Sequence, residues 1–259
     1  MQDAFDHCER LVREHDKDRF LAALFAPREK RQALFSLYAF DIEIARVPVI
    51  ARQPLAGEVR LQWWREVLSG DRGEEARASP IAAAISATLQ GRRELIGPLD
   101  ALLEAQRADL YDDPVKTLSD LEEYAEAAYA PVIDVAIRLL CNKPAIETSE
   151  FAAHAGKALL LERVARGAES TVASRLPPYG TTITTAALCE SAMDHLERAH
   201  TLSRSMPGET WQAFLPLALV PLRLKKLAMS DAIHRTPQPD VPQWRRQWAL
   251  WRAARRRRL

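Results

Sequence analysis

The sequence predicts an all-α protein that folds as a single-domain helical bundle. Amphipathic periodicity, with apolar residues three and four positions apart, recurs almost throughout the 259 residues. Only 9 residues are glycine and β-branched runs are short, whereas alanine, leucine, arginine and glutamate dominate, a composition that favours helix over sheet. No internal repeat or linker divides the chain, whose length lies near the upper limit for one hydrophobic core.

Each expected helix follows from its apolar periodicity and, at several boundaries, from a capping signal. The expected helices cover about residues 3–15, 28–47, 54–69, 81–89, 98–111, 119–140, 149–169, 184–205, 210–229 and 243–256. Ser79 followed by Pro80 is typical of an N-cap and a first helical position, and Pro98 opens the next helix. Ser119 and Glu122 form a capping-box pattern before a long helix.

Positive charge is concentrated at the end of the chain. Residues 244–259 carry seven arginines and no acid, so that the total of +1 leaves a net charge of −6 on residues 1–243. An acidic body argues against nucleic acid as a partner, whereas the basic end suggests contact with something anionic. We therefore divide the chain into a helical domain over residues 1–234 and a proline-rich loop with a basic helix over residues 235–259.

Composition also bears on location and cofactors. The first residues mix acidic and basic side chains without an apolar run, and no stretch approaches the ~18–20 apolar residues of a membrane span. We therefore expect a cytoplasmic protein without a signal peptide or transmembrane helix. Cys8, Cys141 and Cys189 are widely spaced and the histidines lack ligand spacing, so that neither a zinc site nor another cofactor is expected.

Short segments spread over about residues 18–180 stand in the order and spacing of a known family. They are Asp18–Arg31, Leu34–Phe40, Leu61–Arg65, Asp109–Leu110, Asp120–Tyr124, Gly156–Ala158 and Arg175–Pro177. Any one of them is weak, but the ordered set resembles the squalene/phytoene synthase family. The resemblance implies a helical bundle of the isoprenoid synthase type with a central cavity.

Enzymes of that family ionise an allylic diphosphate, and the resemblance implies that Mg²⁺ held by aspartates on facing helices neutralises the leaving group. This sequence departs at the matching aspartate positions, which hold Ala45, Val49, Gly167 and Thr171. Arg46 and Arg163 stand in the same motifs, where a cation repels a metal by roughly several kcal/mol. Asp109 and Asp113 are four apart and offer another metal site, but their neighbours are typical of a solvated turn.

These departures resemble one branch of the family. Phe40–Val47 and Gln62–Arg65 are similar to complex I assembly factor 6 and its bacterial relatives, which have a synthase fold and degenerate metal motifs. The resemblance implies a non-catalytic protein that assists the assembly of respiratory complex I, with its subunits or assembly intermediates as partners. Two alternatives stay open. One is an active prenyl transferase that joins two isoprenoid diphosphates and needs Mg²⁺; the other is a metal-independent binder of an isoprenoid diphosphate or lipid phosphate.

Several polar residues match positions that would line the cavity of the implied fold. They are Tyr38, Asp41, Arg46, Asp109, Lys157, Arg163 and Arg166. One hypothesis is a cationic pocket that holds an anionic headgroup or isoprenoid diphosphate without metal. The alternative, which we favour, is that the cations pair with acids such as Asp41, Glu43 and Glu162 and fill a collapsed cavity.

The last expected helix carries a stripe of tryptophans. Trp244, Trp248 and Trp251 recur at i, i+4 and i+7 and therefore share one face. The arginines around and after them are Arg245, Arg246, Arg252, Arg255, Arg256, Arg257 and Arg258. This composition is typical of a helix at an anionic membrane surface, which would make the protein peripheral on the inner membrane. Packing of the tryptophans on the bundle is the open alternative.

Overall fold

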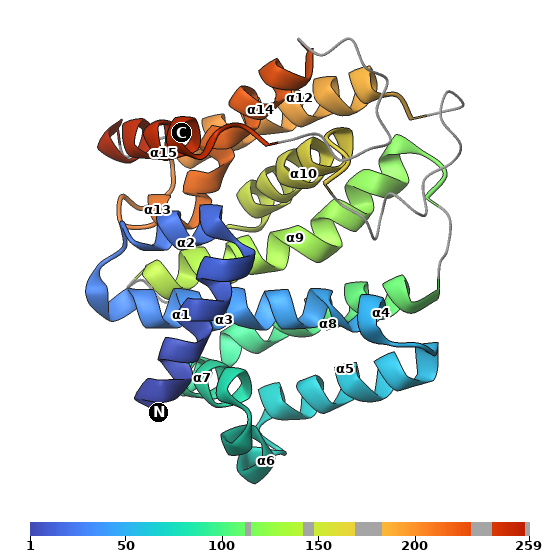
Figure 1. The fold of residues 1–259 in the computed structure, drawn as a ribbon, viewed down its shortest axis with the longest axis vertical. Helices are drawn as coiled ribbons and strands as arrows, with labels where there is room; N and C mark the ends of the chain where they lie inside the picture. The colour runs from blue at the N-terminus through green and yellow to red at the C-terminus, as the bar shows by residue number, and fades with distance from the viewer. Residues whose placement is uncertain (112–114, 142–147, 169–182, 229–239, 257–259) are drawn as a thin grey trace.

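The computed structural model describes residues 1–111, 115–141, 148–168, 183–228 and 240–256, and every regular element in these ranges is helical (Figure 1). In chain order the elements are α1 (Gln2–His15), α2 (Lys17–Ala23), α3 (Arg28–Ala45), α4 (Val47–Ile50), α5 (Pro54–Ser69), α6 (Gly73–Ala78), α7 (Pro80–Leu89), η1 (Arg93–Leu95), α8 (Ile96–Ala108), η2 (Asp109–Tyr111), α9 (Leu118–Leu140), α10 (Ser149–Ala165), α12 (Thr185–Ser203), α13 (Trp211–Phe214), η3 (Leu215–Leu219), α14 (Val220–Ala228) and α15 (Gln243–Arg256). The prediction of an all-α, single-domain fold is confirmed.

Capping chemistry sets several of these boundaries. Ser79 caps α7 as expected, because its hydroxyl accepts a hydrogen bond from the Ala82 amide. The capping box of α9 lies two residues before the predicted one, so that prediction is wrong in position. Thr117 Oγ1 accepts from the Asp120 amide at 3.1 Å, and Asp120 Oδ2 accepts from the Thr117 amide at 3.0 Å.

Two expected helices end early or break. α10 stops at Ala165 rather than near residue 169, because Gly167 adopts a left-handed backbone with φ of 66°. The helix expected over residues 210–229 is divided into α13, η3 and α14. Pro216 and Pro221 lie in this segment and lack the amide hydrogen that a continuous helix would need.

The short helix α2 is missing from the sequence-based prediction. Asp16 ends α1 and caps α2, since its carboxylate accepts a hydrogen bond from the Arg19 amide at 2.9 Å. α1 and α2 therefore meet at a sharp corner, visible at the left of Figure 1. Beside this corner, Asp18 pairs with Arg223 of α14 and Arg246 of α15, and Arg19 pairs with Asp41 of α3.

The core is built around α9. This helix runs through the middle of the bundle, with α10 and α12 on one side and α3 and α8 on the other (Figure 1). α10 approaches α9 closely at Gly156, where an added Cβ would lie 3.0 Å from the Ala130 amide nitrogen. The absence of a side chain at Gly156 thus allows the backbones to approach and fixes the position of α10.

The last helix, α15, packs on α2 and η3 at the opposite end of the molecule from α5 (Figure 1). Its buried residues join a small apolar cluster separate from the main core, made of Ala22, Leu215, Leu219, Leu250, Ala253 and Ala254. The boundary between residues 1–234 and 235–259 falls in a segment outside the described residues, so that division stays a prediction.

Candidate functional site: a buried ion network

Two neighbouring groups of ion pairs, together called the ion network here, lie between helices: one joins α2 to α3, and the other joins α2, α10, α14 and α15. The ion pairs of this network join five carboxylates and four arginines, and the charge of a fifth arginine, Arg163, acts on Asp16: the members are Asp16, Asp18, Asp41, Glu162, Asp240, Arg19, Arg166, Arg223, Arg246 and Arg163. The formal charges of this set therefore balance.

Arg19 organises the part of the ion network beside α3. Its guanidinium pairs with Asp16 Oδ2 and Asp41 Oδ2, each at 2.6 Å, and lies 5.0 Å from the centre of the Tyr38 ring. Burial alone would lower the pKa of Arg19, but its two acid partners raise it. Burial disfavours the Asp16 carboxylate, yet the charges of Arg19 and Arg163 hold its pKa below the usual value.

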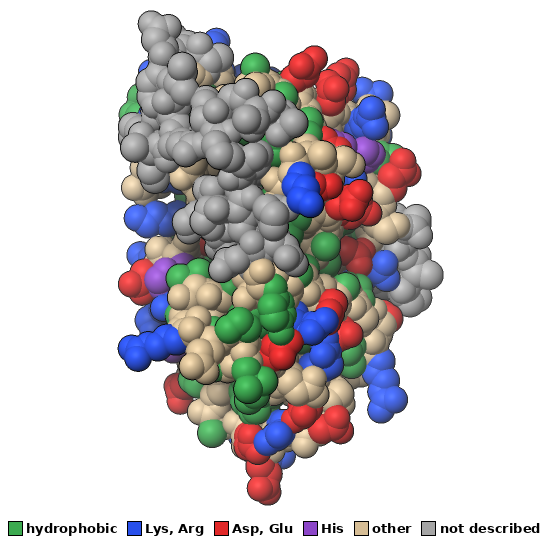
Figure 2. Space-filling view, turned by 90° about the vertical axis from the view of Figure 1, so that its right-hand side faces the viewer, with side chains coloured by type: hydrophobic (Ala, Val, Ile, Leu, Met, Phe, Trp, Pro, Cys, Tyr) green, Lys and Arg blue, Asp and Glu red, His purple; other side chains and the backbone are tan. Residues whose placement is uncertain are grey.

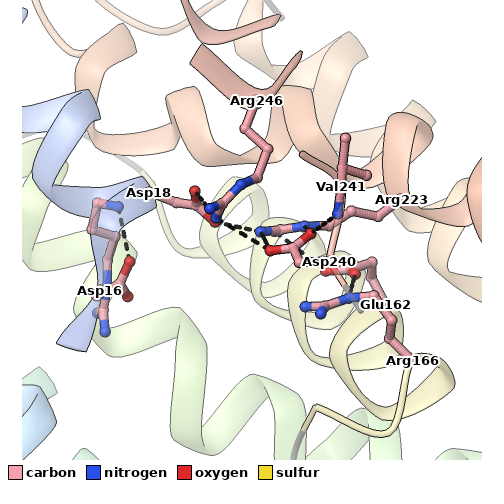
Figure 3. A network of polar contacts seen from close by, with 9 residues as sticks. Asp16, Asp18, Glu162, Arg166, Arg223, Asp240, Val241 and Arg246 are labelled. Atoms are coloured by element: carbon pink, nitrogen blue, oxygen red, sulfur yellow. Dashed lines mark hydrogen bonds and ion pairs between the residues drawn. The ribbon is translucent and has the colours of Figure 1, made fainter. Parts of the chain in front are cut away.

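Arg223 of α14 is the centre of the second part (Figure 3). It contacts both carboxylate oxygens of Asp240, at 3.0 and 2.9 Å, in a bidentate pair, and it also donates to Asp18. Arg246 of α15 approaches the same two acids, with Nη1 2.9 Å from Asp18 Oδ1 and 3.2 Å from Asp240 Oδ2. Burial alone would raise the pKa of Asp240. The hydrogen bonds and the charge of Arg223 outweigh this effect, so that the pKa of Asp240 lies below its usual value.

Glu162 joins α10 to this centre. Its side chain is only 1% exposed, and Oε1 accepts from Arg166 Nε at 2.5 Å. The other oxygen, Oε2, lies 3.7 Å from Arg223 Nη1, which is an ion pair but too long for a hydrogen bond. The charge of Glu162 is thus balanced by two arginines, although only one of its carboxylate oxygens accepts a hydrogen bond.

Four of the seven candidate cavity residues lie in or beside the ion network, in its two separate parts. Tyr38 and Asp41 lie beside Arg19, Arg166 pairs with Glu162, and the charge of Arg163 acts on Asp16.

The other three candidates lie elsewhere. Arg46 is exposed, and Lys157 pairs with Glu126 Oε2 at 2.7 Å. Asp109 is buried and accepts a hydrogen bond from the Tyr124 hydroxyl at 2.7 Å. The hypothesis of an anion-binding cavity stays a prediction.

Sequence reasoning missed Asp18, Arg223, Asp240 and Arg246 as a group. One signal was available for Arg223, which stands four residues after the buried Leu219 of η3 and four before the buried Leu227 of α14, at helical spacing from both. An arginine in such a position must be paired when it is buried.

The residues at the family's metal-binding positions do not fit Mg²⁺. Ala45, Val49 and Gly167 have no side-chain oxygen to offer, and Thr171 lies outside the described residues. In the part of the chain that the structure describes, no three His, Cys, Asp or Glu side chains are grouped so that they could hold a metal ion.

Two grooves of about 640 Å³ each lie on the side of the molecule formed by α5, near α8 and α7. Val59 and Trp63 line both grooves, whereas none of the seven candidate cavity residues lines either of them. Val49, Ile50, Leu55 and Val59 are exposed nearby, and hydrophobic side chains gather on the lower half of the face in Figure 2. The central cavity implied by the resemblance stays a prediction.

The tryptophans of α15 face away from the bundle. Trp244, Trp248 and Trp251 are 64%, 54% and 40% exposed, whereas Leu250 and Ala254 on the opposite side are buried. Arg257 and Arg258 lie outside the described residues, and Arg255 and Arg256 are exposed. No helix among the described residues combines the length and apolar character needed to cross a bilayer.

Comparison with solved structures defines the class of fold. A dehydrosqualene synthase in complex with a ligand gives a TM-score of 0.71 at 18% identity, covering 98% of this chain and 96% of that chain. Squalene synthase HpnC from Alicyclobacillus acidocaldarius gives 0.70 at 20% identity, covering 87% of this chain and 93% of its own. The helices therefore adopt the isoprenoid synthase fold.

The model of the squalene/phytoene synthase family matches residues 12–175, and the chain belongs to that family. It is similar to proteins named NADH dehydrogenase (ubiquinone) complex I, assembly factor 6. The Bos taurus protein is 24% identical over 152 residues, which are 59% of this chain and 45% of that protein. The Homo sapiens protein is 25% identical over 154 residues, which are 59% of this chain and 46% of that protein. The Mus musculus protein is 21% identical over 247 residues, which are 87% of this chain and 74% of that protein. The chain thus spans slightly less than half of the bovine and human proteins.

Proposed function

We propose that this chain assists the assembly of respiratory complex I at the membrane surface and does not catalyse prenyl transfer. The similarity to several proteins named complex I assembly factor 6 carries the proposal. Its non-catalytic part is supported by Ala45, Val49 and Gly167, which offer no ligand for the metal that would activate a diphosphate.

The ion network also supports a non-catalytic role. A diphosphate that entered between α2 and α10 would have to displace carboxylates already bound to Arg19, Arg166 and Arg223. Each displaced acid would then be buried without a partner, which is costly. Binding of complex I subunits or assembly intermediates, rather than of an isoprenoid, is therefore the function that we propose.

Deletion of the gene in the native host tests this function. We expect lower NADH:quinone oxidoreductase activity in isolated membranes and less assembled complex I on native gels, both restored by the wild-type gene. The profile of isoprenoid hydrocarbons should not change. Normal amounts of active complex I in the deletion strain would contradict the proposal.

Purified protein separates the two alternatives. Incubated with farnesyl or geranylgeranyl diphosphate and Mg²⁺ beside an active squalene synthase, it should release no diphosphate and form no condensed product. Turnover would favour the prenyl transferase. Binding of farnesyl diphosphate without metal, lost on Arg163→Ala, would instead favour the metal-independent binder.

A further inference from the structure

α15 has two faces with opposite roles. Leu250, Ala253 and Ala254 are buried against α2 and η3, and the three tryptophans point to the other side of the helix. Trp248 and Trp251 stack on each other with ring centres 4.9 Å apart, which forms a continuous aromatic ridge. Exposed tryptophans grouped in this way are unusual on a protein surface without a binding role.

Arginines lie next to the exposed tryptophans. Arg245 lies 5.1 Å from the Trp244 ring and Arg255 lies 5.0 Å from the Trp251 ring. Arg252 is also exposed, and the helix contains no acidic residue. Because helical residues advance by ~100° each, Arg245 and Arg252 fall on one flank of the ridge.

The inner face keeps this outer surface in place. Arg246 is the one arginine of the described part of α15 that takes part in the ion network, through Asp18 and Asp240. The buried pairs fix the rotation of α15 about its axis, so that the tryptophans cannot turn inward without breaking them. The remaining arginines stay available to an external partner.

We infer that the outer face of α15, formed by Trp244, Trp248, Trp251, Arg245, Arg252 and Arg255, docks on the surface of an anionic lipid bilayer. Charge complementarity identifies the partner, because a purely cationic helix matches a surface of lipid phosphates. Tryptophan prefers the region between headgroups and acyl chains, and a helix lying parallel to the membrane would place the arginines at phosphate level. This inference rests on the proposed function for its setting, since it names the surface by which the chain would reach the membrane.

Vesicle flotation with the purified full chain tests the inference. We expect binding to vesicles of phosphatidylglycerol and phosphatidylcholine, weakened by salt, and little binding to phosphatidylcholine alone. The double variant Arg245→Glu, Arg252→Glu should reduce partitioning more than about tenfold, since each arginine near the surface contributes a factor of roughly five. The triple variant Trp244→Ser, Trp248→Ser, Trp251→Ser should lose binding and the quenching of tryptophan fluorescence by brominated lipids.

A matched control removes exposed apolar side chains from the opposite end of the molecule. The triple variant Val49→Ser, Ile50→Ser, Leu55→Ser should bind vesicles as the wild type does. Thermal melts check that every variant is folded.

Three results would overturn the inference: no binding of the wild type to anionic vesicles, equal binding to neutral ones, or full binding by the tryptophan variant. The first would assign the face to an acidic protein partner. Because vesicle binding needs no complex I, its failure is distinguishable from the failure of the proposed function.

Discussion

The two segments matched by sequence to the family's aspartate motifs differ in how charge is placed. At the end of α10, charge is retained but neutralised within the protein, since Arg166 pairs with the buried Glu162. At the corner between α3 and α4, both matched positions hold apolar residues on the surface, beside the exposed Arg46. Ala45 is exposed there, and Val49 is 69% exposed.

This difference separates two kinds of constraint. A buried charge must keep its partner, because removal of one member leaves the other unpaired in a medium that solvates it poorly. Folding therefore restrains the residues around Glu162 and Arg223. An exposed apolar residue such as Val49 is hydrated in both the folded and the unfolded chain, so that folding hardly restrains it. The α10 side is thus a scaffold that folding constrains, whereas folding places little constraint on the exposed side chains of the α3–α4 corner.

The largest effect should follow from breaking the ion network at its centre. Replacement of Arg223 by methionine leaves Asp18, Asp240 and Glu162 with fewer cations around them. We expect a loss of about 3–5 kcal/mol in the free energy of unfolding, the usual cost of breaking a buried ion pair. Guanidinium denaturation measures this loss, and thermal melts should show a midpoint lowered by about 10 °C.

Arg65→Met provides the matched control, because Arg65 pairs with Asp100 on the surface and both side chains are more than one third exposed. That substitution should cost at most about 1 kcal/mol. Equal losses in the two variants would show that the ion network contributes no more than a surface pair and would remove the distinction between scaffold and surface.

The same contrast explains what the sequence could and could not predict. The tryptophan stripe of α15 follows from a local period, which a single helix carries within its own sequence. The ion network does not, because Asp18 and Arg223 are 205 positions apart and only the tertiary fold brings them together. α2 was missed for a related reason, since a seven-residue helix with one cap is too short for periodicity to be read. The resemblance to the family predicted the fold, but it could not predict which acidic side chain pairs with which arginine.

The free energy of unfolding, measured as the pH is lowered, should distinguish the contribution of the ion network from that of a histidine pair between α10 and α12. His154 Nδ1 lies 2.7 Å from His195 Nδ1 of α12, and Glu122 lies 3.5 Å from His195 Nε2. Burial, followed by nearby positive charge, lowers the pKa of His154 below 6.5, and burial likewise lowers that of His195 despite Glu122. The two histidines therefore bind protons more readily in the unfolded chain than in the folded one. The contribution of the pair is therefore full above pH 6.5 and is lost as the pH falls through the lowered pKa values.

Two carboxylates of the ion network, Asp16 and Asp240, titrate in a lower pH window. Asp16 and Asp240 have pKa values below 3.8, so their contribution is present above that pH and disappears as the pH falls further. Stability measured against pH should thus decline in two separate steps. The double variant His154→Asn, His195→Asn should abolish the first step and retain the second. A single decline that the variant does not alter would contradict this assignment.

The smallest effect is expected at the α3–α4 corner. The substitutions Val49→Ser and Ile50→Ser remove two exposed apolar side chains that are 69% and 55% accessible to solvent. Little apolar area is returned to water by unfolding at these positions, so the free energy of unfolding should change by no more than about 0.5 kcal/mol. Guanidinium denaturation of the double variant and of the wild type measures this change in the free energy of unfolding. A loss comparable to that of Arg223→Met would mean that the corner is packed in solution, and both motif positions would then be parts of one scaffold.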